Sequence, residues 1–204
     1  MTSEAKKGGF PTWAKILIGV VVVGIIGSIA LAVGMVFFFQ NMVKQSQDPV
    51  AIAKTAKSIA TFADPLPSGY KFSMALDIAG IKTVTVEHQS DSQMLTFMSF
   101  PKKDETSDPQ ALVDKLYETG IQTHQTSAKF NEVKKKGSMD VAGETMPYIV
   151  GEMQSDSGKK FQGMVGCIIP KGKSETFFVY GMQPQGKDYN LDGTEEFLKT
   201  IKGF

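Results

Sequence analysis

The sequence predicts an α+β protein in which a single N-terminal transmembrane helix precedes an antiparallel sheet packed with helices. Three observations lead to this prediction. An unbroken apolar run occupies residues 16–39. Most of the chain after residue 70 alternates apolar and polar residues at the period of a strand, and these stretches are joined by glycine-containing turns. Three shorter segments, which lie before, between and after these strands, have the period of a helix, and this grouping is typical of an α+β domain.

The apolar run has the length of a membrane-spanning helix. Residues 16–39 would form a helix of about 36 Å, enough to cross a hydrocarbon core of about 30 Å. The hydrophobic region of a signal peptide is shorter and ends in small residues at a cleavage site. Here the run ends in bulky residues, "MVFFFQNMVKQ". We therefore predict an uncleaved signal-anchor rather than a signal peptide that is removed.

The flanks of the span predict the localisation. Lysines precede it at Lys6, Lys7 and Lys15 and follow it at Lys44, Lys54 and Lys57, so the positive-inside count is nearly a tie. Because the N-terminal tail is short, it is expected to stay in the cytoplasm. We predict a single-pass protein of the inner (plasma) membrane, with a cytoplasmic tail at 1–15, a juxtamembrane linker and amphipathic helix at 40–65, and an extracytoplasmic α+β domain at 66–204.

Small residues gather on one side of the predicted span. At 100° per residue they fall away from a sector of β-branched residues. Small residues let two helix backbones approach closely in lipid. The candidates for a helix–helix interface, with a second copy or another membrane protein, are Gly24, Gly27, Ser28 and Gly34. The alternative is that they reflect the glycine content of membrane helices in general.

Each element of the outer domain has its own sequence signal. Asp48 followed by Pro49 predicts a helix start, and the helix should end before the prolines at 65 and 67. Its apolar face is Ile52, Ala56, Ile59 and Ala63. Another Asp-Pro start predicts a helix over 108–119, with Gly120 as its stop. Strands are predicted at 70–78, 81–89, 93–100, 129–141, 145–154, 161–169 and 175–183, and a last helix at 193–204.

Composition limits the classes of function. The net charge is +1, which argues against a nucleic-acid-binding module with a basic face. All 22 basic residues are lysines, so bidentate clamping of phosphate by guanidinium is not available. The single cysteine, Cys167, lies in an apolar run and is predicted to be a small buried hydrophobe.

One string resembles the start of a calcium loop. "DYNLDG" places oxygen-bearing residues at Asp188, Asn190 and Asp192, followed by a glycine. Position 12 of such a loop would be Lys199, where a glutamate should complete the coordination shell, so only Glu195 or Glu196 could substitute. The alternative is an Asx turn that caps the final helix. No metal site is therefore predicted.

The remaining motifs predict structure rather than chemistry. "SGYK" at 68–71 matches S-x-x-K without the later motifs that this chemistry requires. The lysines at 134–136 precede Gly137 and predict a solvated turn, with an anionic lipid contact as the alternative. His88 and His124 have no metal-ligand spacing. Five methionines in apolar strands are predicted to fill the core, namely Met74, Met94, Met98, Met164 and Met182. We predict no catalytic residue and no cofactor.

Four short strings carry a resemblance to a known family. "LPSGYKF", "DPQALVDKLYETG", "VAGETMPYIVGE" and "EEFLKTIKGF" together resemble the PsbP/DcrB-like superfamily over Leu66 to Phe204. The resemblance implies an α/β/α sandwich around a twisted antiparallel sheet. It also implies a non-catalytic role, because members are mostly extrinsic subunits of photosynthetic complexes, envelope proteins and binding adaptors. The N-terminal anchor departs from the soluble and lipid-modified members.

These observations together predict a non-enzymatic protein. The expected function is that of a membrane-anchored interaction or assembly protein, such as an accessory subunit of a larger membrane complex. Its expected partners are the lipid bilayer and the helices of other membrane proteins, with no nucleic acid. The alternative is a receptor-like domain that binds a ligand or calcium.

Overall fold

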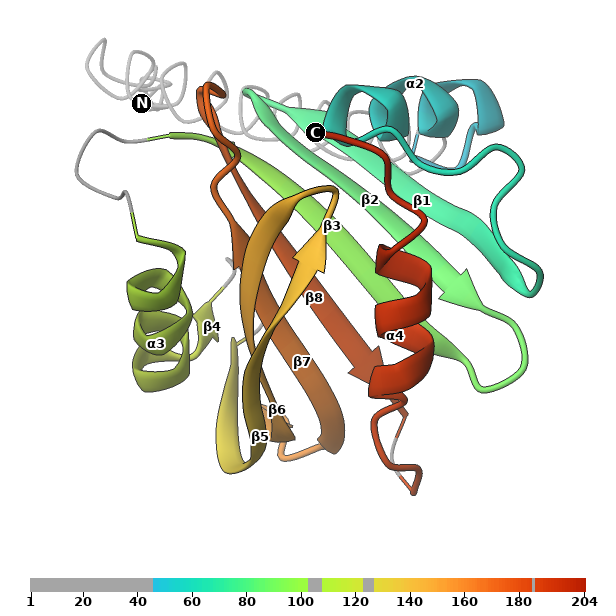
Figure 1. The fold of residues 1–204 in the computed structure, drawn as a ribbon. Coiled ribbons are helices and arrows are strands. Elements are labelled where there is room, and N and C mark those ends of the chain that lie inside the picture. Colours follow the sequence, from blue (N-terminus) through green and yellow to red (C-terminus); the bar gives the residue numbers. More distant parts are fainter. Residues whose placement is uncertain (1–45, 103–107, 123–126, 185) are drawn as a thin grey trace, which may run out of the picture. The chain divides into compact units, whose positions relative to one another are not determined.

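A computed structural model of the chain describes residues 46–102, 108–122, 127–184 and 186–204 (Figure 1). Its centre is an antiparallel sheet in the order β1-β2-β3-β8-β7-β6-β5-β4. The strands are β1 (Tyr70–Ile78), β2 (Ile81–His88), β3 (Gln93–Pro101), β4 (Ile121–Gln122), β5 (Ser127–Val141), β6 (Glu144–Ser155), β7 (Lys160–Ile168) and β8 (Glu175–Gln183). The helices are α2 (Pro49–Ile59), α3 (Pro109–Thr119) and α4 (Leu191–Leu198). The predicted α+β class with an antiparallel sheet is confirmed.

The two Asp-Pro signals do begin helices. The Asp48 carboxylate accepts the Val50 N–H at 3.2 Å, and the Asp108 carboxylate accepts the Gln110 N–H at 2.9 Å. In each helix the proline that follows occupies a position whose N–H would have no partner inside the helix. Capping of this kind stabilises a short helix by about 1 kcal/mol, which explains why these boundaries could be predicted locally.

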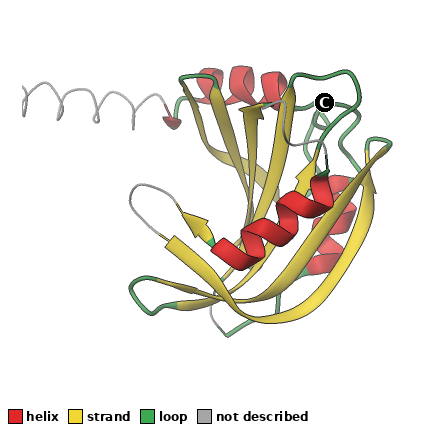
Figure 2. Ribbon diagram, turned by 90° about the vertical axis from the view of Figure 1, so that its left-hand side faces the viewer, coloured by secondary structure: helices red, strands yellow, loops and turns green. Residues whose placement is uncertain are grey.

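The sheet carries helices on both faces (Figure 2). The larger core lies on one face, where α2 and α4 pack through Ile52, Ile59 and Phe197 against buried strand residues such as Phe97 and Val179. The smaller core lies on the other face, where α3 packs through Val113 against Ile149 and Cys167. Because α2 contributes to the larger core, it belongs to the compact unit Gln45–Phe204.

Helix α2 ends earlier than its apolar pattern predicts. Ala60 is already extended, with φ −154° and ψ 161°. The next residue pairs with the C-terminal segment, since the Thr61 N–H donates to Gly203 O at 2.8 Å and the Lys202 N–H donates to Thr61 O at 2.9 Å. Long-range backbone pairing therefore ends the helix four residues before Ala63.

The lysine run at 134–136 is not a turn. It lies inside β5, in which Gly137 pairs with Tyr148 of β6. A Cβ atom on Gly137 would lie 2.8 Å from the Tyr148 hydroxyl, so the glycine makes room for that aromatic ring. The glycine that suggested a turn thus serves a cross-strand contact. Lys134 and Lys136 each pair with a carboxylate, on Asp188 and Asp114 respectively.

The methionine prediction holds only for Met164, which is fully buried in the larger core. The register places the other four on the opposite face, where Met94 pairs with Met182 and Met98 with Phe178. Met74 is 40% exposed. The prediction was wrong because an apolar strand pattern shows that a face is apolar but does not show whether a helix covers it.

None of the helices in the described part of the chain is long and apolar enough to cross a bilayer. The predicted span at 16–39 lies outside the described residues, and so do its interface candidates Gly24, Gly27, Ser28 and Gly34. They remain predictions.

Candidate functional site

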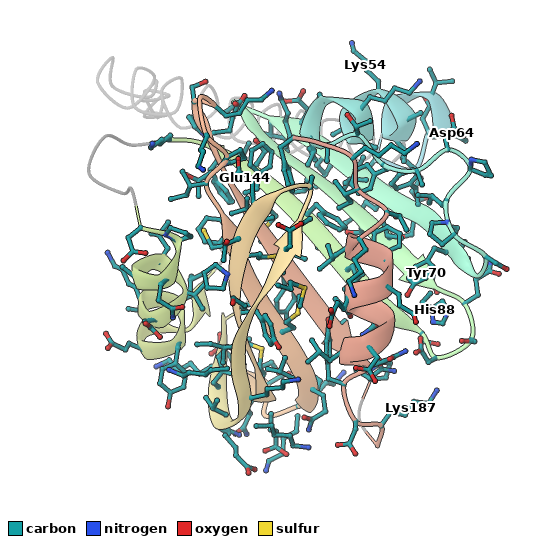
Figure 3. All side chains as sticks on the ribbon, in the orientation of Figure 1. Lys54, Asp64, Tyr70, His88, Glu144 and Lys187 are labelled. Carbon is teal, nitrogen blue, oxygen red and sulfur yellow. The ribbon has the colours of Figure 1, made fainter. Side chains whose placement is uncertain are left out.

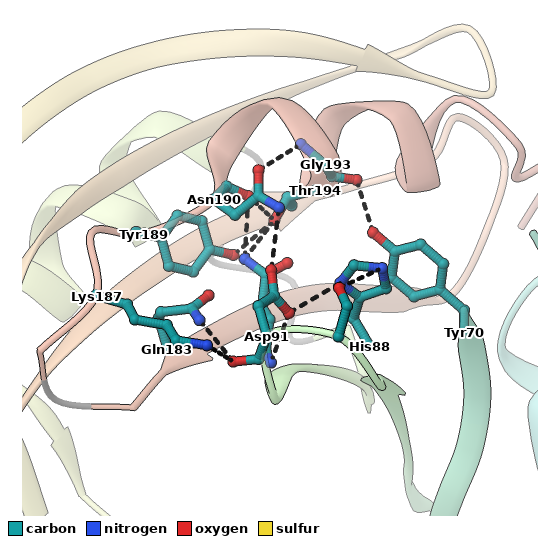
Figure 4. A network of polar contacts seen from close by, with 11 residues as sticks. Tyr70, His88, Asp91, Gln183, Lys187, Tyr189, Asn190, Gly193 and Thr194 are labelled. Carbon is teal, nitrogen blue, oxygen red and sulfur yellow. Dashed lines mark hydrogen bonds and ion pairs between the residues drawn. The ribbon is translucent and has the colours of Figure 1, made fainter. Parts of the chain in front are cut away.

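A network of polar side chains lies at the end of the sheet where the turn between β2 and β3 meets the segment before α4 (Figure 4). Figure 3 shows Tyr70, His88 and Lys187 near this end, whereas Lys54 and Glu144 lie toward the other. The network joins residues that are far apart in sequence, since Asp91 and Asn190 are separated by 99 positions.

The centre of the network is a histidine–aspartate pair. His88 ends β2, and its Nδ1 lies 2.8 Å from Asp91 Oδ1 in the turn that follows. Both side chains are 19% exposed. Asp91 Oδ1 also accepts the Gln93 N–H at 3.1 Å, while Oδ2 accepts from Asn190 Nδ2 at 3.2 Å. The carboxylate is therefore fixed from three sides, and it orients the imidazole.

These contacts determine the ionisation of Asp91. Burial by itself raises the pKa of this carboxyl group. The hydrogen bonds from the Gln93 N–H, the Asn190 amide and the His88 ring outweigh burial, so the pKa of Asp91 lies below its ordinary value. Asp91 is thus held as a carboxylate, which favours a proton on Nδ1 of His88 and leaves Nε2 as the nitrogen available to a ligand.

Tyr70 packs against the imidazole. Its ring stacks on His88 with centroids 4.5 Å apart, and its hydroxyl donates to Gly193 O in α4 at 3.0 Å. Burial raises the pKa of Tyr70, and the charges of Asp91 and Glu196 raise it further. The Tyr70 hydroxyl therefore stays protonated and keeps its hydrogen bond to α4.

The segment before α4 is anchored by the same network. Asn190 Oδ1 accepts the Gly193 N–H at 2.9 Å and caps α4. The buried Gln93 side chain donates to Asn190 O at 3.0 Å and to Thr194 Oγ1 at 3.1 Å. Gln183 Nε2 donates to Asp91 O at 2.9 Å, which ties the end of β8 to the β2–β3 turn. The turn, the strand end and the helix start therefore hold one another in place.

A pocket of about 530 Å³ opens beside this network. It is lined by Pro67, Ser68, Tyr70, His88, Asn190, Asp192, Gly193, Glu196, Phe197 and Thr200. Its lining contains two exposed carboxylates and no lysine, so its electrostatic character favours a cation. The volume falls within the usual range of small-molecule sites, about 300–1,000 Å³.

The geometry of Ser90 differs from that of an activated nucleophile. Ser90 Oγ lies 3.3 Å from Nδ1 of His88 and 3.5 Å from Nε2, so it is not placed on one nitrogen as a Ser–His pair requires. Among the residues that the structure describes, no group of three or more His, Cys, Asp or Glu side chains could hold a metal ion.

The structure places the three residues of the calcium-like string in separate roles. Asp188 pairs with Lys134 at 2.9 Å, Asn190 caps α4, and Asp192 lines the pocket. Because the oxygen of Asn190 is already engaged by Gly193, the string forms the Asx-type cap that was the alternative interpretation. The Asp188 carboxylate has a lowered pKa because it accepts a hydrogen bond from Lys134.

The other sequence candidates lie apart from this site or contribute little to it. Lys71 pairs with Glu87 at 3.4 Å, so the S-x-x-K match is a turn entering a strand. Cys167 is buried, and burial raises the pKa of its thiol to about 12. His124 lies outside the described residues. No family model matches the chain, and no curated protein matches its sequence.

Proposed function

We propose that the chain is a membrane-anchored, non-catalytic binding protein whose folded unit recognises a small molecule bearing a cationic amine or guanidine. The observation that carries the proposal is the pocket beside the His88–Asp91 pair. Its lining combines an oriented imidazole, the carboxylates of Asp192 and Glu196, and the apolar surfaces of Tyr70 and Phe197. The imidazole Nε2 would accept a hydrogen bond from the ligand, and the carboxylates would bind its charge.

Two further points support the proposal. Hydrogen bonds within the protein already orient His88 and Asn190 beside the pocket, so a ligand would not have to order them, which favours affinity. The resemblance to the PsbP/DcrB-like superfamily also supports a binding role over an enzymatic one. The anchor at 16–39 is part of the proposal and rests on the hydropathy and length of that segment.

The test is calorimetric titration of the full-length protein in mild detergent with putrescine, agmatine and spermidine. At least one of these cations should bind. Exposed ion pairs contribute up to about 1 kcal/mol, so Glu196→Gln should weaken binding about two- to fivefold. Glu195→Gln is the matched control, because the neighbouring Glu195 pairs with Lys199 at 2.9 Å rather than lining the pocket.

The double change Asp192→Asn, Glu196→Gln should weaken binding more than either change alone. The proposal of a cation site fails if no cation produces heat. It also fails if Glu195→Gln weakens binding as much as Glu196→Gln, since that would indicate a general charge effect.

A second candidate is the assembly role that the sequence predicts, and one observation favours it. A groove of about 680 Å³ runs between α2 and the segment 60–66. Its lining is mainly apolar: Ala53, Ala56, Ala60, Phe62, Ala63, Pro65, Leu66 and Phe72, with Lys57, Thr61 and Asp64 among them. A groove of this character could accept an apolar side of another protein. Co-purification of a stable partner with the full-length protein in mild detergent would favour this candidate.

A further inference from the structure

Exposed apolar side chains concentrate on one hairpin of the sheet. Of the five large apolar residues that are exposed in the described part of the chain, three lie on β1 and β2. These are Met74 at 40%, Ile78 at 44% and Ile81 at 41% exposure. Ile78 pairs directly with Ile81 across the Ala79–Gly80 turn, so the two isoleucines form the tip of the hairpin.

The three side chains lie on one face of the sheet. The register shift between Phe72 and Met74 puts Met74 and Ile78 on the face opposite the larger core, to which Ala75 points. On this same face α3 packs on β6 and β7, in the other half of the sheet (Figure 1). The half formed by β1 and β2 therefore presents an apolar corner, which we define as Met74, Ile78 and Ile81.

The corner lies at the end of the sheet near which the folded unit begins. Figure 1 shows the β1–β2 turn at the same end as α2. The predicted span ends at Phe39, and residues 40–47 connect it to the cap of α2. A chain of this length reaches at most about 28 Å at about 3.5 Å per residue. The predicted anchor therefore limits the start of α2 to within about 28 Å of the bilayer.

Charge around the tip is close to balanced. Lys82, Lys102, Lys171 and Lys173 lie at this end of the sheet, because Lys102 N donates to Ser174 O beside the β7–β8 turn. Asp77, Glu144 and Glu175 lie among them, since Asp77 pairs with Lys82 in the register and the Glu144 carboxylate accepts the Lys171 N–H at 3.0 Å. The lysines can extend toward headgroups, but the apolar side chains distinguish this surface. A contact here should therefore need little anionic lipid.

We propose that the apolar corner rests in the interfacial layer of the bilayer that holds the anchor. Ile78 and Ile81 would insert at the boundary between headgroups and acyl chains, where apolar side chains on an exposed turn leave water without having to span the membrane. This inference rests on the membrane anchor of the proposed function, and it is independent of the ligand pocket. The occupant to which we commit is lipid rather than a second copy of the chain.

The experiment places a fluorescent probe at the tip. Full-length protein carrying Ile81→Cys is labelled with an environment-sensitive NBD dye and reconstituted, one copy per nanodisc, in phosphatidylcholine with or without phosphatidylglycerol. Native Cys167 is fully buried, so it should not be labelled in the folded protein. We expect blue-shifted NBD emission and strong quenching by lipids doxyl-labelled near the headgroup, in both lipid compositions.

The matched control is Ser157→Cys in the β6–β7 turn, at the opposite end of the strands. Its probe should emit as in water and escape quenching. Equal emission and quenching at the two positions would overturn the inference. A blue shift at Ile81→Cys that requires two copies per disc, without lipid quenching, would also overturn it in favour of a dimer.

Carbonate extraction of membranes from cells that express the full-length protein tests the anchor separately from the contact at the hairpin tip. Release of the chain into the soluble fraction would refute the anchor and, with it, the proposed location. A chain that stays integrated while its tip probe remains unquenched would refute only the contact between the hairpin and the bilayer.

Discussion

Asp91 is the residue on which the candidate site depends most. Its carboxylate accepts hydrogen bonds from the Gln93 N–H and Asn190 and pairs with His88, and its backbone carbonyl accepts from Gln183. A group with so many donors around it stabilises the fold only while it is ionised. Because its pKa is lowered in the folded protein, its contribution is present above the unfolded pKa of about 3.9 and is lost as the pH falls through the folded pKa.

The residue-level prediction is a pH-dependent loss of stability in Asp91→Asn. At neutral pH we expect a decrease of about 1–2 kcal/mol in the free energy of unfolding, because the amide cannot accept at both positions or pair with His88. The difference from the native protein should begin to shrink below about pH 4, where Asp91 of the unfolded chain becomes protonated, and should be lost only when the pH falls below the lowered pKa of the folded protein. Urea unfolding followed by circular dichroism across this range measures it.

The control for this variant is Asp77→Asn, an exposed aspartate on β1. Its unfolding profile should follow that of the native protein at every pH. If the free energies of unfolding of Asp91→Asn and the native protein differ by the same amount from neutral to acid pH, Asp91 acts through packing rather than through its charge.

At the scale of the element, the packing of the segment before α4 against strand β8 depends on Gly181. The Tyr189 hydroxyl lies against Gly181 so closely that a Cβ atom there would overlap it. Burial raises the pKa of Tyr189, while its hydroxyl is engaged with Thr194 Oγ1 at 3.0 Å. Tyr189 therefore closes the larger core at the end of β8 only because that strand has no side chain at this position.

The prediction at this scale is that Gly181→Ala destabilises the fold by about 1–3 kcal/mol, as overpacking of a core does. Displacement of Tyr189 should also disturb Asn190 and weaken cation binding. Gly203→Ala is the control, because a Cβ atom there would have no neighbour within 4 Å among the described residues. Thermal unfolding of the two variants measures the difference. Equal melting temperatures would mean that the Tyr189 segment moves away without cost.

The elements could be predicted because their signals are local. The residues of β1, the Asp-Pro caps of α2 and α3, and the glycine after α3 were all predicted from sequence. The ends of α2 and α4 could not be predicted, because the C-terminal segment pairs with Thr61 and competes with helix continuation there. Long-range pairing of this kind leaves no pattern in the helix itself.

The candidate site could not be predicted for the same reason. His88 and Asp91 are three positions apart, and that spacing at a turn is the only local signal of the pair. Their partners Asn190 and Gln183 are brought to them by the sheet order, in which β3 lies beside β8. The Asp188–Asp192 string allowed the cap of the final helix to be considered from sequence, and Asn190 forms it, but the string carried no sign of the pocket that Asp192 lines.

At the scale of the whole molecule, the proposed assembly role makes a prediction about the anchor. Gly24→Ile together with Ser28→Ile should weaken co-purification with partner proteins and leave membrane insertion intact, because bulky residues prevent close helix approach.

Ala53→Glu tests the groove beside α2 by adding a charge at an exposed position. Ser58→Glu, which adds the same charge on the same helix outside the groove lining, is its control.

Pull-down from mild detergent, followed by mass spectrometry, identifies the partner proteins that each variant retains. Loss of partners in the anchor variant alone would assign association to the span, and loss in Ala53→Glu alone would assign it to the groove. Unchanged partners in both variants would refute the assembly role. The two changes are in separate units of the chain, so each effect can be interpreted on its own.

Strand β2 joins the two surfaces that the proposals concern, since it begins at Ile81 in the hairpin tip and ends at His88 in the pocket. An antiparallel strand rises about 3.4 Å per residue, so the two side chains are about 24 Å apart along it. That separation is about three Debye lengths at physiological salt. Anionic headgroups attract amines into a thin layer at the membrane, and with β2 upright on the bilayer the pocket would stand beyond this layer. Its occupancy would therefore follow the concentration of the ligand in the bulk solution rather than the lipid composition.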